Sequence, residues 1–389
     1  MQQQSRRQLT KGKQMKRGSL THPQHNPASP RAPWLGLSRG LSSILTAAFC
    51  LAGVLAPVHD VAAQAKPLQG QTIVVYTFGG TQLEVTKELV FKPFEAETGA
   101  KIVIDDSCCT RMPAVLEAGQ FLGDVVLGLD RGGMLARADK GYLVADPRLE
   151  KIARARGVPE PFPSPSMMIT NSYSYVIAAK DKTVPLPKTW AEFWDAKKFP
   201  GSRGLLRVGP QVQMEAALLA DGVPADKLYP LDVTRALKKL DALRASSKIV
   251  VNTSGADMIN NLGTGEATYS FAYSNRAFMA QKNGINLNYG FDDGFIVGNG
   301  GAILKGAKNV DGAVALLEYN MRPEVLARFA ERTGMAPSYP AATAMVDEKI
   351  RPMLPTAPAN AAKQQMLNDG FWQANQIELN KRWVGWLAQ

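Results

Sequence analysis

Short apolar runs alternate with stretches of helical spacing along most of the chain. Residues 73–76 form a β-branched and aromatic run, and after two glycines apolar residues recur at roughly helical spacing as far as Phe94. Further strand-like runs lie at 101–104 and 124–129, with a helical stretch at 112–118 between them. Strands that alternate with helices in this way predict a parallel sheet with helices on both faces.

The alternation returns in the second half of the chain. The predicted strands are 173–179, 205–208, 268–273 and 302–304, and the predicted helices are 190–195, 214–220, 233–245, 258–262, 276–281, 310–319, 323–332 and an amphipathic tail within 361–387. Between the halves, prolines at alternate positions from Pro159 to Pro165 exclude a continuous helix and predict an extended segment. The glycine-rich stretch 298–301 predicts a turn at which two parts of the backbone approach closely.

These patterns predict an α/β fold, and 389 residues are enough for two separate cores. In open α/β sheets, ligands bind beyond the carboxyl ends of the strands. The turns at 78–81 and 129–133 are therefore the predicted binding region.

The first 65 residues have a different pattern. No acidic residue precedes Asp60, eight Lys and Arg do, and an uncharged apolar run at 41–58 leads to Ala63-Gln64-Ala65. This order predicts a secretory signal peptide over residues 1–65, cleaved near Ala65, and a periplasmic location. A membrane anchor is the weaker alternative, because the run is shorter than the ~20 residues that a spanning helix needs. A start at Met15 and a twin-arginine signal at 5–11 remain open.

Removing this leader changes the chemistry that the chain can offer. It takes away eight of the 45 Lys and Arg but one of the 34 Asp and Glu, so the net charge falls from +11 to +4. All three histidines leave too, which excludes histidine-dependent hydrolysis and removes the commonest ligand of zinc and copper. We therefore expect no cofactor, no metal site and no nucleic-acid partner. Cys108 and Cys109 remain, as a vicinal disulfide or as two thiols.

Two classes of protein fit a secreted, two-lobed α/β chain without histidine. One is a solute receptor whose lobes close on a small molecule. The other is a secreted enzyme that acts through carboxylates such as Asp130, Asp292 and Asp293.

Residues 187–201, with the sequence PKTWAEFWDAKKFPG, resemble a signature of the bacterial extracellular solute-binding proteins of ABC importers. The resemblance points to the branch that includes the spermidine/putrescine-binding proteins, and segments 217–230, 253–256 and 380–387 agree with it in order and spacing. It implies the two-lobed periplasmic binding protein fold (type II), in which each lobe is a mostly parallel sheet flanked by helices and hinge strands join the lobes. The implied lobes are 66–172 plus 298–336 and 173–297 plus 337–389.

The same resemblance implies a function without catalysis. A monomer would capture a small polar solute, such as a polyamine, by lobe closure and deliver it to an ABC permease in the inner membrane. A sensor or chemotaxis protein is an alternative partner that the sequence does not separate from a permease.

Candidate ligand-binding residues follow from the family's binding positions and the predicted turns. They are Phe78, Thr81, Asp130, Arg131, Gln211, Tyr273, Arg276, Asn299 and Gln373.

The chain departs from the polyamine pattern at several of these positions. The loop 209–213 carries no acidic residue, and Asn299 stands where an aspartate would bind an amine. Arg131 and Arg276 would instead suit a carboxylate or phosphonate, because arginine offers a fork of donors to planar oxyanions. Alternatively these arginines pair with Asp130, Asp257 or Asp292 and line nothing.

The ligand therefore stays open between a polyamine, an anionic or amino-acid-like molecule, and thiamine. Thiamine enters because strand 124–130 resembles that of thiamine-binding periplasmic proteins.

Overall fold

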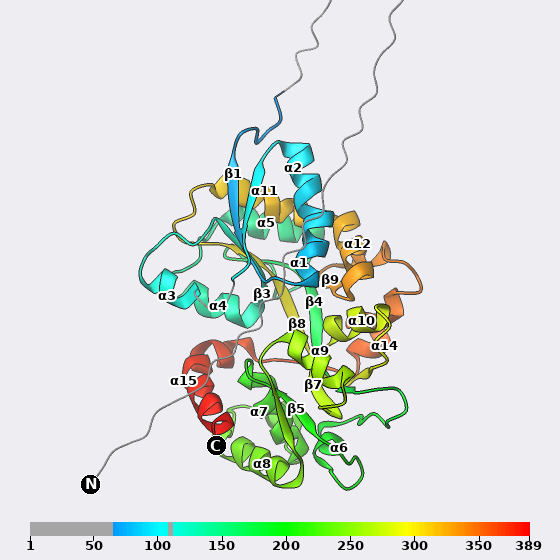
Figure 1. Cartoon of the computed structure of the whole chain (residues 1–389). Coiled ribbons are helices and arrows are strands. Elements are labelled where there is room, and N and C mark those ends of the chain that lie inside the picture. Colours follow the sequence, from blue (N-terminus) through cyan, green and yellow to red (C-terminus); the bar gives the residue numbers. More distant parts are fainter. Residues whose placement is uncertain (1–64, 108–111) are drawn as a thin grey trace, which may run out of the picture. The chain divides into compact units, whose positions relative to one another are not determined.

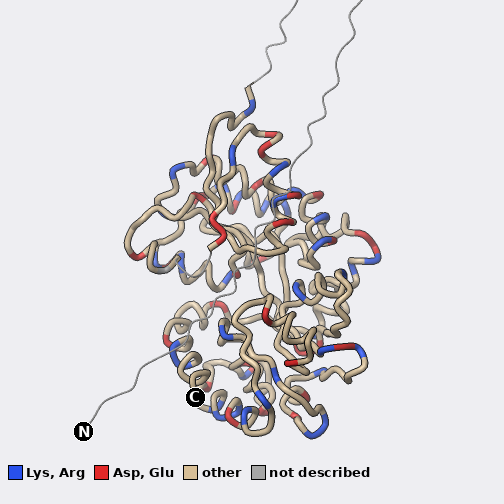
Figure 2. The backbone as a smooth tube through the Cα atoms, in the orientation of Figure 1, with Lys and Arg blue, Asp and Glu red and all other residues tan. Residues whose placement is uncertain are grey.

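The computed structural model describes residues 65–107 and 112–389. The predicted signal peptide up to Gln64 and the pair Cys108–Cys109 lie outside the described residues. Within the described part, every helix is too short or too polar to cross a membrane. Basic and acidic residues are interspersed along the backbone of this part (Figure 2).

One mixed sheet runs through the described residues, in the strand order β2-β1-β3-β8-β4-β7-β5-β6 (Figure 1). The strands are β1 (Thr72–Tyr76), β2 (Lys101–Asp105), β3 (Val125–Asp130), β4 (Met168–Ala179), β5 (Arg203–Leu206), β6 (Ile249–Asn252), β7 (Tyr269–Tyr273), β8 (Asn288–Ile303), β9 (Ala336–Pro337) and β10 (Gln365–Met366). Neighbours pair in parallel at both ends of the sheet, where β1 lies between β2 and β3, and β5 lies between β6 and β7. The long strands β4 and β8 pair antiparallel in the middle and join the two parallel parts.

Helices cover the sheet between these strands. They are α1 (Thr81–Thr86), α2 (Lys92–Thr98), α3 (Met112–Glu117), α4 (Arg131–Asp139), α5 (Pro147–Arg156), α6 (Trp190–Trp194), α7 (Pro210–Ala220), α8 (Val233–Ser246), α9 (Gly255–Gly263), α10 (Ser274–Lys282), α11 (Val310–Asn320), α12 (Pro323–Thr333), α13 (Pro340–Ala344), α14 (Pro358–Ala361) and α15 (Asp369–Leu387). A π-helical turn, η1 (Lys87–Phe91), joins α1 to α2, and short 3₁₀ turns lie at η2 (Ala225–Lys227) and η3 (Arg351–Met353).

The signature at 187–201 folds as a capped helix that anchors a core. Thr189 accepts a hydrogen bond from the backbone N–H of Glu192 and so caps α6. Trp190 is fully buried, stacks on Phe271 of β7 with 4.4 Å between ring centroids, and donates its indole N–H to the carbonyl of Asp293 at 2.8 Å. These contacts fasten α6 to both β7 and β8.

The apolar residues gather into two large clusters. One surrounds β1, α2 and α11, and the other surrounds β7, α7 and the aromatic face of α15. Two separate cores are what two lobes require, and we keep the division into lobes as a proposal. Tyr339, the residue before α13, and Ala342 of α13 pack in the first cluster, whereas the proposed division returns the chain to the second lobe at residue 337.

The structure corrects the expectations in three places. Residues 298–301, predicted as a turn, lie inside β8, and the glycines are needed because a Cβ at Gly300 would lie 1.9 Å from the carbonyl oxygen of Met168. The predicted turn at 129–133 continues directly into α4, because Asp130 caps that helix. Strand β6 was not predicted because it has only four residues, and helix α5 was not predicted because five of its ten residues are charged.

Candidate functional site

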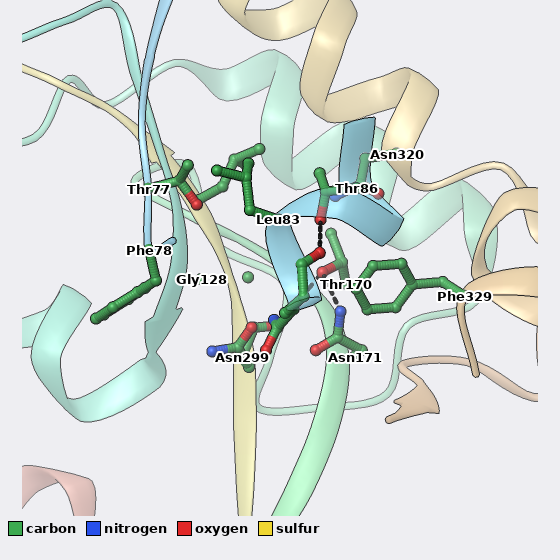
Figure 3. A pocket seen from close by; sticks show the side chains of 13 residues that line it. Thr77, Phe78, Leu83, Thr86, Gly128, Thr170, Asn171, Asn299, Asn320 and Phe329 are labelled. Atoms are coloured by element: carbon green, nitrogen blue, oxygen red, sulfur yellow. Dashed lines mark hydrogen bonds between the residues drawn. The ribbon is translucent and has the colours of Figure 1, made fainter. Parts of the chain in front are cut away.

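Two cavities lie at the carboxyl end of β3, where β4 and β8 cross between the two parallel parts of the sheet. The first cavity is drawn in Figure 3, and its empty space of about 470 Å³ includes space open to solvent. It is lined by Thr77, Phe78, Gln82, Leu83, Thr86, Leu127, Gly128, Thr170, Asn171, Asn299, Gly300, Asn320 and Phe329.

The second cavity lies beside Asp130, and its empty space of about 330 Å³ also includes space open to solvent. Its lining comes from β3, α4, β4, α7, β8 and α15: Asp130, Gly132, Tyr175, Gln211, Val297, Leu367, Asp369, Trp372 and Gln376. Strand β3 of one parallel part, the joining strands β4 and β8, and the C-terminal helix therefore contribute to this cavity.

Asp130 is the carboxylate at the point where β3 becomes α4. Its Oδ1 accepts a hydrogen bond from the backbone N–H of Gly133 at 2.6 Å, and Asn299 lies opposite it in the sheet register. Burial raises the pKa of Asp130, against the lowering effect of the Gly133 N–H and the nearby charge of Arg137. A cation placed in the second cavity would stabilise the ionised carboxylate.

Three tyrosines form an aromatic cluster next to Asp130. The ring centroids of Tyr173, Tyr175 and Tyr273 lie 5.1 to 5.8 Å apart. Burial, together with the negative charge of Asp130, raises the pKa of Tyr173 and Tyr175 well above the usual value. The cluster therefore presents neutral phenols, which can contact alkyl chains and attract cations through their ring faces.

Arg276 lies next to Tyr273 of this cluster, in the first turn of α10. A Cβ at Gly80 would lie 3.9 Å from its Nη1 and a Cβ at Gly255 would lie 3.3 Å from its Nε, so the guanidinium lies between the N-terminal ends of α1 and α9. Burial lowers the pKa of Arg276, and the nearby Tyr273 opposes that effect. Among the described residues, no carboxylate forms an ion pair with Arg276. A half-buried cation that forms no ion pair with a described carboxylate is a candidate receptor for an anion.

Two buried amides present oxygens to the cavities. Gln211 Oε1 and Asn171 Oδ1 have no hydrogen-bond partner in the part of the chain that the structure describes, although both residues are more than nine-tenths buried. Gln211 lines the second cavity and Asn171 the first. Buried polar atoms are rarely left unpaired, so each oxygen is a place for a donor from a ligand or from water.

Arg131 does not present a free guanidinium. It donates from Nη1 to Asp369 Oδ2 of α15 at 2.5 Å and from Nη2 to the carbonyl of Pro161 at 3.3 Å. The expected pairing of the arginines with Asp130, Asp257 or Asp292 is therefore wrong for Arg131.

The other two acids have partners of their own. Asp257 accepts from Thr253, and Asp292 pairs with Lys363 at 3.1 Å.

The remaining predicted residues divide between cavity and surface. Phe78 and Asn299 line the first cavity, whereas Thr81 is exposed at the start of α1 and lines neither. Gln373 donates a hydrogen bond to Asp139 of α4, and it is Gln376, almost one turn further along α15, that lines the second cavity.

The sequence reasoning missed Asn171, Tyr175 and Asp369 as members of the site. A signal for the first was present, because Thr170, Asn171 and Ser172 put three polar residues into a strand that is otherwise apolar and buried. Nothing local marks Asp369, whose role depends on the contact between α15 and α4.

Comparisons with known proteins agree with this geometry. The family model "Bacterial extracellular solute-binding protein" matches residues 90–359. A γ-aminobutyric acid (GABA)-binding protein of Pseudomonas aeruginosa is 31% identical over 345 residues, covering 84% of this chain and 94% of that protein.

Solved structures are also similar. An ABC transporter substrate-binding protein from Bradyrhizobium japonicum has a TM-score of 0.74 at 31% identity, covering 81% of this chain and 99% of that one. The Atu4243–GABA receptor has a TM-score of 0.72 at 28% identity, covering 81% and 97%. The predicted fold class is thereby confirmed. The spermidine/putrescine type is not confirmed, since two of these relatives are named for GABA.

Proposed function

The chain belongs to the bacterial extracellular solute-binding proteins of ABC transporters, and on that premise we propose that its ligand is a small zwitterion with one carboxylate and one ammonium group, such as GABA. The observation that carries this proposal is that groups of opposite charge lie at different members of the tyrosine cluster: Asp130 acts on Tyr173 and Tyr175, and Arg276 lies next to Tyr273.

Arg276 would bind the carboxylate end of the ligand. Its guanidinium has no acidic partner among the described residues and lies between the N-terminal ends of α1 and α9. A carboxylate there would restore the solvation that burial removes from the arginine, and the fork of N–H donors matches the two carboxylate oxygens.

The second cavity would bind the ammonium end. Asp130 and the unpaired Oε1 of Gln211 both line it, and an ammonium group has three donors to share between such acceptors. The faces of Tyr175 and Tyr273 would cover the short alkyl chain between the two charged ends, where burial and cation–π attraction add to the affinity.

A polyamine fits this arrangement less well. It carries an ammonium group at each end, so one end would lie against Arg276 with no carboxylate of the described residues to offset the repulsion. The relatives named for GABA also favour the zwitterion over a polyamine or thiamine.

The family is one of solute-binding proteins of ABC transporters and not of enzymes, so the carboxylate-dependent enzyme is excluded. Family membership also implies an extracytoplasmic location and an ABC permease as partner. We propose that the chain acts as a monomer in the periplasm. We also propose that the contact between α4 and α15, made by Arg131 and Asp369, belongs to the closed form that holds the ligand.

Isothermal titration of the chain from Lys66 onward with three ligands of equal carbon number tests the proposal. GABA, putrescine and succinate each have four carbons. GABA ends in one ammonium and one carboxylate group, putrescine in two ammonium groups, and succinate in two carboxylates. We expect GABA to bind at least tenfold more tightly than either of the other two, because a group of the wrong charge at one end costs more than 1.4 kcal/mol. Tighter binding of putrescine would restore the polyamine prediction, and tighter binding of succinate would mean that Asp130 does not face the ligand.

A further inference from the structure

Two carboxylates, and not one, face the second cavity. A Cβ at Gly132 would lie 3.3 Å from Asp369 Oδ1 and 3.8 Å from Asp130 Oδ1, so both oxygens lie within 4 Å of one point. Like charges this close repel, and the charge of Asp369 contributes to raising the pKa of Asp130. Two adjacent carboxylates would attract a dication more strongly than a zwitterion.

Arg131 neutralises one of these two carboxylates. Its guanidinium holds Asp369 Oδ2 at 2.5 Å, and the two side chains are each only 18% exposed. The ring of Phe162 lies 5.8 Å from the guanidinium carbon and the carbonyl of Pro161 accepts a second hydrogen bond, so the arginine is fixed on the Asp369 side.

Two other ionisable groups lie close to the cavity but do not line it. Arg137 donates to the carbonyl of Gly133 and to the sulfur of Met112, and forms no ion pair with Asp130. Glu215 lies behind Trp372, whose indole N–H it accepts at 2.6 Å.

We propose that Arg131 is a specificity-determining residue: by pairing with Asp369 it cancels one of the two negative charges beside the second cavity, and so disfavours diamines, whose net charge is positive, relative to zwitterions with a single ammonium group. The inference rests on the proposed function, because it takes the second cavity as the site of the ammonium end. It also reconciles the two carboxylates beside this cavity with the proposed preference for a zwitterion over a diamine.

The test measures putrescine and GABA affinity by isothermal titration on a charge cycle: wild type, Arg131→Gln, Asp369→Asn and the double variant. Arg131→Gln uncovers Asp369, so putrescine should bind on the order of tenfold more tightly than to wild type. Asp369→Asn leaves Arg131 unpaired beside the cavity, so both amines should bind more weakly. The double variant restores the net charge and should return the ratio of the two affinities to its wild-type value.

Two control variants separate charge from packing. Arg131→Lys keeps the charge and should gain no putrescine affinity. Arg154→Gln removes an equal charge from an exposed ion pair with Glu150 on α5 and should leave both affinities unchanged. Melting temperatures confirm that each variant is folded.

Failure of this inference and failure of the proposed function give different results. If Arg131→Gln binds putrescine no better than wild type, Arg131 does not set the charge preference and the inference is overturned. If instead all three variants of the cycle bind both ligands more weakly and to an equal extent, the ion pair is only a contact between α4 and α15, which also overturns the inference. Wild type that does not bind GABA would refute the proposed function, while the putrescine comparison would still decide the role of Arg131.

Discussion

The buried carboxyl of Glu215 gives the stability of this protein a predictable dependence on pH. Glu215 lies one turn after Gln211 on α7 and is 1% exposed. Its Oε1 accepts hydrogen bonds from the hydroxyl of Tyr229 and from the indole N–H of Trp372 on α15. Burial raises the pKa of Glu215 from 4.5 to about 7, more than these two donors lower it.

The sign of the effect follows from proton binding. Because the carboxyl has a higher pKa in the folded protein than in the unfolded chain, the folded state holds the extra proton between pH 4.5 and about 7. Stability from this group is therefore complete at low pH and is lost as the pH rises through that window. At 1.4 kcal/mol for each pH unit, the loss is about 3 kcal/mol.

Glu215→Gln should abolish this dependence, because the amide keeps an acceptor for Tyr229 and Trp372 but does not ionise. Urea unfolding of both proteins from pH 4 to pH 8 gives the difference in their free energies of unfolding, in which the other titrating groups cancel. As the pH rises from 4 to 8, we expect the free energy of unfolding of wild type to fall by about 3 kcal/mol relative to that of the variant. Glu266→Gln, at an exposed ion pair with Lys248, is the matched control and should show a flat difference. If the stability of wild type relative to Glu215→Gln stayed constant or increased with pH, the raised pKa of Glu215 would be refuted.

Further predictions concern the packing that holds the site. Gly300→Ala would place a Cβ 1.9 Å from the carbonyl oxygen of Met168, so the free energy of unfolding should fall by about 3 kcal/mol or more, as measured by urea unfolding. Gly385→Ala, in the open interior of α15, should instead raise it by about 0.5 to 1 kcal/mol, and an equal effect of the two changes would contradict the close approach at β8. Trp190→Ala removes a fully buried indole stacked on Phe271 and should cost about 3 to 5 kcal/mol, whereas a loss below 1 kcal/mol would show that α6 does not anchor the core.

The sequence predicted the parts of the fold that depend on local patterns. Strand β1, the helix after it and the helix at Trp190 were all predicted from the spacing of their apolar residues. The role of the glycines in β8 could not be predicted from local signals. Glycine is required there because the backbone of β4 approaches closely, and β4 lies more than a hundred residues away in the chain.

The sequence could identify candidate residues of the site, but not which of their charged side chains form ion pairs. Asp130 and Arg276 could be named as candidates because they follow predicted strands. That Arg276 lacks an acidic neighbour among the described residues while Arg131 has Asp369 depends on how α4, α10 and α15 come together, and no spacing in the sequence reports that.

The measurement that tests the central claim most directly is the affinity of Arg276→Gln for GABA and for butylamine, which has the same chain and ammonium group but no carboxylate. If Arg276 binds the carboxylate, the variant should lose on the order of a hundredfold in affinity for GABA and little for butylamine, because a buried charge pair loses one partner only in the first case. Arg207→Gln, at an exposed arginine after β5, serves as the control and should change neither. Unchanged GABA affinity in Arg276→Gln, or an equal loss for both ligands, would contradict the account.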